Sequence, residues 1–128
     1  MAKFLHNILM ALAPVPDILA VLREFLETDL LPDAALSDDK RFNLRVAINL
    51  LATAERELRL GPAASDAEEK RLATFVGNEG SLDEKNRRLA RAIREGAIHG
   101  GDPQLLEHLQ QTVTDALRIN NPKWIGGL

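Results

Sequence analysis

Apolar residues recur at spacings of three and four along most of the chain, which is the pattern of amphipathic helices. In the stretch from about 16 to 31, one face carries Ile18, Leu19, Val21, Leu22, Phe25, Leu26 and Leu30, with charged residues opposite. The stretch over about 39–60 is apolar on most of its circumference, which is typical of a helix surrounded by others. No segment alternates as a β-strand would.

Capping and helix-breaking residues divide the remaining sequence. Gly61-Pro62 is expected to end the 39–60 helix. Ser65 with Glu68, and Ser81 with Glu84, have the spacing of a capping box and predict helices that end near Gly77 and Gly96. A cap at Asp102 followed by Pro103 begins the last helix. The sequence therefore predicts an all-α fold, a compact bundle of about five helices around a long central helix over about 39–60.

The ends of the chain are set apart from this bundle. We divide the sequence into an N-terminal extension over 1–15, a helical domain over 16–124 and a tail over 125–128. Within the extension, an apolar stripe has helical spacing and predicts a short amphipathic helix that serves as an interface or covers the bundle; it consists of Phe4, Leu5, Ile8, Leu9 and Leu12. A secretion signal is disfavoured because polar residues interrupt this run and Pro14 follows the best cleavage position.

Composition narrows the function classes. The 128 residues contain 16 basic and 19 acidic side chains, so no strong positive field favours nucleic acid or an anionic membrane. The chain contains no cysteine, and its three histidines do not form a metal-binding pattern, so we expect no metal and no cofactor. We read the histidines as exposed or capping residues and expect a cytoplasmic protein.

Several polar residues fall where the helical pattern calls for apolar ones. They are Asp29, Arg45, Asn49, Arg56, Glu57 and Asn86. Buried polar groups need partners, and Asp29 with Arg45 is the first pair we expect. Two interpretations stay open, a polar pocket between helices and a hydrogen-bond network that fixes helix register. No catalytic arrangement is recognised, so an enzymatic function is the less favoured one.

Two groups of motifs resemble an uncharacterised bacterial family of small helical domains. The first runs from Leu22-Arg23-Glu24-Phe25-Leu26-Glu27 through Arg41-Phe42, Arg45-Val46-Ala47 and Asn49-Leu50 to Glu55-Arg56-Glu57-Leu58 and Leu60-Gly61. The second contains Leu89, Ile93, Arg94, Gly96, Asp102-Pro103 and the Asn120–Pro122 region. The resemblance extends from about Pro16 to Trp124 and excludes the N-terminal extension.

The resemblance implies a type of partner but no catalytic residues. Members of that family tend to be encoded beside, or fused to, phosphotransferases that resemble aminoglycoside kinases, and beside acyl-CoA dehydrogenases. It therefore implies a non-enzymatic accessory domain that binds a phosphotransferase-like or acyl-CoA-processing enzyme. The interface would be the N-terminal stripe or Trp124, and a homodimer is an alternative use of the stripe. The alternative function is a small-molecule-binding helical bundle with a polar pocket between helices.

Overall fold

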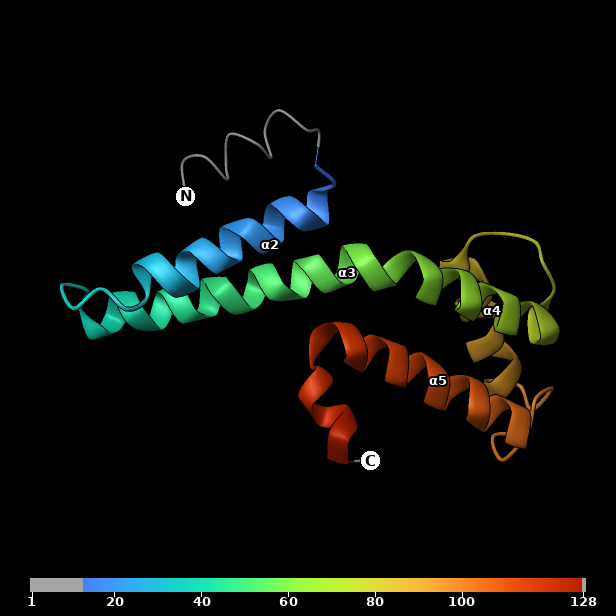
Figure 1. Cartoon of the computed structure of the whole chain (residues 1–128). Coiled ribbons are helices and arrows are strands. Elements are labelled where there is room, and N and C mark those ends of the chain that lie inside the picture. Colours follow the sequence, from blue (N-terminus) through green and yellow to red (C-terminus); the bar gives the residue numbers. More distant parts are fainter. Residues whose placement is uncertain (1–12, 128) are drawn as a thin grey trace. The chain divides into compact units, whose positions relative to one another are not determined.

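The computed structural model describes residues 13–127, and its regular elements there are all helices (Figure 1). In order these are α2 (Val15–Phe25), the π-helical turn η1 (Leu26–Leu30), α3 (Asp38–Val76), α4 (Leu82–Arg94), α5 (Pro103–Asn120) and the 3₁₀ helix η2 (Pro122–Gly127). No strand occurs among these residues. The predicted all-α class is confirmed.

The predicted number of helices is wrong, because the helices expected over 39–60 and 65–76 form one continuous helix. α3 contains 39 residues and includes Pro62 in its interior. Proline removes one backbone hydrogen bond and costs about 3 kcal/mol in a helix interior. The flanking sequence supplies alanines at 63, 64 and 67, the residue with the highest helix propensity, so the helix continues on both sides. Ser65 consequently lies within the helix instead of capping one, and the described chain has four α-helices instead of five.

Contacts divide the chain into two units, which meet between Arg59 and Leu60. The first unit contains α2, η1 and the first part of α3, and the second contains the rest of α3, α4, α5 and η2. This differs from the single bundle expected around a helix over 39–60. The boundaries of the extension and tail stay predictions, since residues 1–12 and 128 lie outside the described part.

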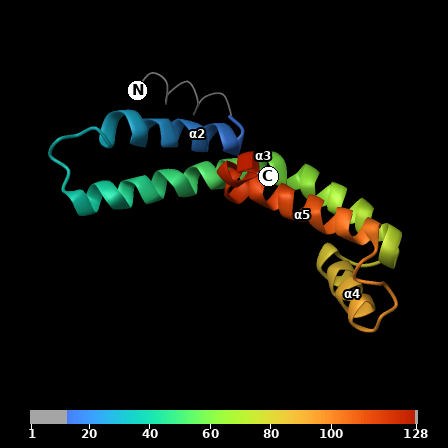
Figure 2. The same ribbon diagram turned by 90° about the horizontal axis from the view of Figure 1, so that it is seen from below.

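In the first unit, α2 runs alongside the first part of α3 (Figures 1 and 2). Two ion pairs join them: the Arg23 Nε lies 3.3 Å from a Glu55 oxygen, and the Arg59 Nη2 lies 2.7 Å from Asp17. The buried residues of this unit are Val21 and Ile48. This small core does not surround α3, so the expectation of a central helix enclosed on most sides is wrong.

The connection between these helices is held by one side chain. Arg41 of α3 donates hydrogen bonds to the backbone carbonyls of Leu31, Asp33 and Leu36. These carbonyls follow the end of the π-helical turn and have no helical partner, so the guanidinium group satisfies them. Arg41 thereby fixes the loop that reverses the chain direction.

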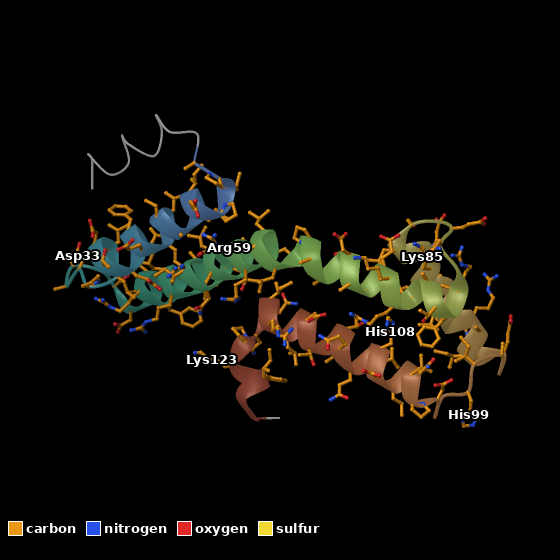
Figure 3. The ribbon with its side chains drawn as sticks, turned by 45° about the vertical axis from the view of Figure 1, so that its right-hand side comes forward. Asp33, Arg59, Lys85, His99, His108 and Lys123 are labelled. Atoms are coloured by element: carbon orange, nitrogen blue, oxygen red, sulfur yellow. The ribbon has the colours of Figure 1, made fainter. Side chains whose placement is uncertain are left out.

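The second unit has its own apolar core. One leucine from each of its three α-helices is buried: Leu72, Leu89 and Leu105. Partly buried residues pack against them, namely Phe75, Val76, Leu82, Ile93 and Ile98. A second contact joins α4 to α3: Lys85, which Figure 3 labels, is buried, and its ammonium donates to the carboxylate of Glu69.

The predicted starts of α4 and α5 are confirmed. At α4, the Glu84 backbone N–H donates to the Ser81 hydroxyl, and the Glu84 carboxylate accepts from the Ser81 backbone N–H at 2.7 Å. The bonds that the carboxylate accepts from the Ser81 backbone N–H and from the Ser81 hydroxyl stabilise its ionised form and lower the Glu84 pKa. At α5, the Asp102 side chain accepts from the Gln104 N–H. Over the described residues, no helix combines the length with the apolar character that crossing a membrane requires.

Candidate functional site

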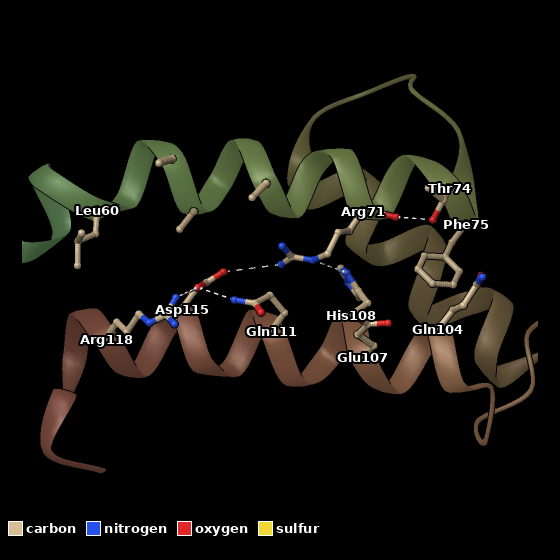
Figure 4. A pocket seen from close by; sticks show the side chains of 13 residues that line it. Leu60, Arg71, Thr74, Phe75, Gln104, Glu107, His108, Gln111, Asp115 and Arg118 are labelled. Carbon is tan, nitrogen blue, oxygen red and sulfur yellow. Dashed lines mark hydrogen bonds and ion pairs between the residues drawn. The ribbon is translucent and has the colours of Figure 1, made fainter. Parts of the chain in front are cut away.

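A groove lies between the second part of α3 and α5 (Figure 4). Its volume is about 860 Å³, and it is open to solvent. α3 lines it with Leu60, Ala63, Ala64, Ala67, Arg71, Thr74 and Phe75, and α5 lines it with Gln104, Glu107, His108, Gln111, Asp115 and Arg118. All of these residues belong to the second unit. The groove is therefore positioned by the core that joins α3, α4 and α5.

The α3 side of the groove is apolar toward Leu60 and polar toward Arg71. The alanines at 63, 64 and 67 fall on the same helix face as both residues, because each step is three or four residues. An alanine side chain ends at Cβ and does not fill the space in front of it. This row of small residues explains why two neighbouring helices leave a groove between them.

The α5 side carries a cluster of polar side chains centred on Asp115. Its Oδ1 accepts hydrogen bonds from Gln111 Nε2 and from Arg118 Nη1, both at 2.9 Å. Arg71 reaches across from α3, and its Nη2 lies 3.9 Å from the other oxygen of Asp115 (Figure 4). Asp115 is only 16% exposed, so two guanidinium groups and an amide compensate a mostly buried carboxylate.

His108 lies in the middle of the groove and is only 3% exposed. Its Nδ1 accepts a hydrogen bond from Arg71 Nε at 3.4 Å, which assigns the neutral ring proton to Nε2. The ring also packs against Phe75, with the ring centres 5.7 Å apart. Burial lowers the pKa of His108, the Arg71 cation lowers it further, and Glu68 opposes both effects. The neutral form is therefore favoured in the folded protein.

This lowered pKa predicts a loss of stability in mild acid. In the unfolded chain His108 has the ordinary histidine pKa of 6.5, and in the folded chain its pKa is lower. As the pH falls, the unfolded chain therefore binds this proton at a higher pH than the folded chain does. The free energy of unfolding should therefore fall as the pH is lowered from about 7.5 to about 5.5, and His108→Gln should reduce that fall. Urea unfolding at both pH values measures it. An equal fall in the variant would show that His108 contributes nothing to the pH dependence.

The polar residues singled out from the sequence do not line this groove. Asp29 and Arg45 are exposed and form no ion pair with each other, and the Asp29 carboxylate accepts a hydrogen bond from the Thr28 hydroxyl at 2.8 Å. α-Helical periodicity places Asp29 on the apolar face of its helix. Asp29 lies in the π-helical turn, however, where that periodicity does not hold. The expected pair is wrong for that reason.

The other members of that set belong to different surroundings. Asn49 and Glu57 are exposed, and Arg56 donates to the Thr53 hydroxyl within α3. Asn86, in the second unit, donates to the Glu68 carboxylate at 3.0 Å and so joins α4 to α3. This hydrogen bond between two helices is of the kind expected if the polar residues form a structural network instead of a pocket.

Of the interface residues predicted from the sequence, the structure describes only Trp124. Trp124 in η2 is 68% exposed, as an interface residue of a free chain would be. The stripe of Phe4, Leu5, Ile8, Leu9 and Leu12 lies outside the described residues. His99 accepts from the Gly101 N–H, as expected for a histidine that stabilises a loop, whereas His108 is buried instead of exposed.

A sequence signal for the groove exists, although sequence reasoning missed it. On α5, His108, Gln111 and Asp115 follow one another at steps of three and four, so they define a polar strip. The alanines and Arg71 form a matching strip on α3. Periodicity gives each strip but not their pairing, which depends on how the two helices pack. In the part of the chain that the structure covers, no group of three acidic or histidine side chains is placed to hold a metal ion.

Comparison with known proteins identifies one family. No curated protein and no solved structure gives a significant match. A family described as a domain of unknown function, DUF6285, matches residues 34–124. This region includes all of α3, α4 and α5 and therefore the whole groove. Because the match extends over more than half of its residues, the chain belongs to the DUF6285 family.

Proposed function

We propose that the chain is a non-enzymatic accessory domain that binds another protein through the first unit. The observation that carries the proposal is the amount of apolar surface that this unit exposes. Val21 and Ile48 are its buried residues, whereas eight large apolar side chains are exposed: Val15, Ile18, Leu22, Leu30, Phe42, Val46, Leu50 and Leu58. Large exposed apolar patches mark interaction sites in otherwise polar surfaces.

The strongest part of this surface is a stripe on α3. Phe42, Val46 and Leu50 succeed one another at steps of four residues and share one helix face. They are 64%, 42% and 66% exposed, whereas Ile48 on the face toward α2 is 6% exposed. We call these three residues the α3 stripe. Such a stripe fits an apolar helix of a partner, with Phe42 as the aromatic anchor.

We take the proposed partner from the family that the sequence resembles, whose members are encoded beside, or fused to, two kinds of enzyme. It is a phosphotransferase-like protein or an acyl-CoA dehydrogenase of the same bacterium. The exposed Trp124 supports a further contact at the end of the second unit. The N-terminal stripe is the other interface that the sequence predicts, and a homodimer through it is the competing arrangement.

A binding experiment with purified proteins tests this function. The full chain is titrated by calorimetry with the phosphotransferase-like protein and with the acyl-CoA dehydrogenase encoded beside its gene. One of them should bind, and Phe42→Asp with Leu50→Asp should together weaken that binding by about a thousandfold, since each anchor buried in the complex is worth about 2 kcal/mol. Val113→Asp changes an equally exposed apolar residue of α5 and should have no effect.

Two outcomes would contradict the proposed function. In the first, neither enzyme binds, or the double variant binds as tightly as the wild type. In the second, light scattering shows a dimer that the double variant converts to a monomer, which would assign the α3 stripe to a second copy of the chain.

A second candidate function is the binding of a small molecule. The observation that favours it is the groove of the second unit, whose volume of about 860 Å³ lies within the range of small-molecule sites. Polar side chains converge there on Asp115 from both helices. The two candidate functions use different units, so one chain has room for both.

A further inference from the structure

We propose that the groove binds a small molecule that consists of a carboxylate on an aliphatic body. The proposal rests on the second candidate function and names the class of ligand and the side chains that hold it. Arg71 would bind the carboxylate, with Arg118 nearby, and the alanine row of α3 would contact the aliphatic part.

Arg71 has hydrogen-bond donors without partners. Its Nε donates to His108 at 3.4 Å and its Nη2 to Thr112 at 3.3 Å, both longer than the usual 2.9 Å. Its Nη1 has no partner among the described residues. A guanidinium carries five N–H donors in a planar fork that matches the two oxygens of a carboxylate. Arg71 is therefore held in place by weak bonds while part of its donor set stays available.

The charge of Arg71 is only partly compensated. Asp115 is its nearest carboxylate, but at 3.9 Å it forms no hydrogen bond with Arg71. Instead, its Oδ1 accepts from Arg118 and Gln111 at 2.9 Å. Glu107, the other acidic residue of the lining, forms no ion pair in the described part of the chain. An incoming carboxylate would consequently meet an incompletely paired cation, and such charge-assisted bonds are among the strongest hydrogen bonds in proteins.

The neighbours of Arg71 restrict the ligand further. The lowered pKa of the buried His108 favours its neutral form, so the part-buried Arg71 is the cation at the centre of the groove. This arrangement suits a ligand with a single negative charge better than a phosphate with two. Arg118, whose side chain is 54% exposed, provides a second cation toward the Leu60 end.

The apolar wall indicates an extended aliphatic body. Leu60 and the alanines at 63, 64 and 67 precede Arg71 along one face of α3. At 1.5 Å per residue, Leu60 and Arg71 lie about 16 Å apart along the helix axis. An aliphatic chain that starts at Arg71 and runs toward Leu60 would cover these methyl groups. Removal of its apolar surface from water would favour binding.

Titration of the full chain with decanoate tests the proposal. Calorimetry below the micelle concentration should give saturable binding with a Kd below about 1 mM, whereas decanol, which lacks the charge, should bind at least about tenfold more weakly. Arg71→Gln removes the cation and should weaken decanoate binding about tenfold or more. Ala67→Leu fills the groove without changing its charge and should also weaken it. Circular dichroism verifies that both variants are folded.

Two control variants change residues outside the groove and should leave ligand binding intact. Arg87→Gln removes an exposed arginine of α4 that pairs with Asp83, and it should leave decanoate binding unchanged. The double variant of the α3 stripe should also bind decanoate normally. If decanol binds as well as decanoate, or Arg71→Gln has no effect, the carboxylate class is wrong while small-molecule binding survives. If neither ligand binds, the proposal is overturned, and the protein-binding function is tested separately by its own titration.

Discussion

Truncation of Leu72 to alanine should lower the free energy of unfolding by about 2–5 kcal/mol, the range for a buried leucine that leaves a cavity. Leu72 is completely buried and lies where α3, α4 and α5 meet, packed with Leu89 and Leu105. Domains of this size have a total stability of about 5–15 kcal/mol, so the variant would lose a large fraction. Urea unfolding followed by circular dichroism measures the loss.

The matched control is Leu106→Ala on α5. Leu106 follows the buried Leu105 directly but is 51% exposed, so the same truncation removes little buried surface. We expect a loss below about 1 kcal/mol. Equal losses in Leu72→Ala and Leu106→Ala would contradict the packing described for the second unit. Such a result would mean that Leu72 of α3 does not pack in that core.

Removal of Glu69 should destabilise the protein more than removal of Lys85. The Lys85 side chain is 2% exposed and its ammonium donates to Glu69, so Glu69→Ala leaves a buried cation without its carboxylate. A stranded buried charge costs about 3–5 kcal/mol. The Glu69 side chain is 47% exposed, so water replaces part of the interaction, and we expect a loss of about 1–3 kcal/mol.

Lys85→Met provides the comparison, because it keeps most of the length of the side chain and removes its charge. The loss should stay below about 1.5 kcal/mol, since a methionine packs in nearly the same volume and Glu69 can be hydrated. Urea unfolding of both variants gives the difference. A larger loss in Lys85→Met than in Glu69→Ala would show instead that the ion pair makes a net favourable contribution.

Local signals were sufficient for the helices whose ends are capped. The Ser81–Glu84 box and the Asp102 cap are formed by neighbours in sequence, and the structure contains both. The same reasoning failed at Gly61-Pro62, because a single proline does not outweigh helix formers on both sides. It also failed at Asp29, where a π-helical turn changes the register on which helical periodicity depends.

The candidate site was harder to predict than the helices. Arg71 and His108 are separated by 37 positions, and their hydrogen bond exists only because α3 and α5 pack together. Periodicity assigns a residue to a helix face but does not say which neighbour covers that face. For the same reason, the helix over about 39–60 was predicted to be surrounded by others, although its residues Phe42 and Leu50 are 64% and 66% exposed. An apolar stripe has the same pattern whether it meets the chain's own core or a partner.

Hydrogen–deuterium exchange of the full chain, alone and with its enzyme partner, tests the central claim most directly. The claim is that a partner binds over the α3 stripe, so amides of α3 around Phe42 to Leu50 should exchange more slowly in the complex. Amides of α5 around His108 to Asp115, beside the groove, should be unchanged. Slower exchange confined to α5, or no change along the α3 stripe when the partner is bound, would contradict the account.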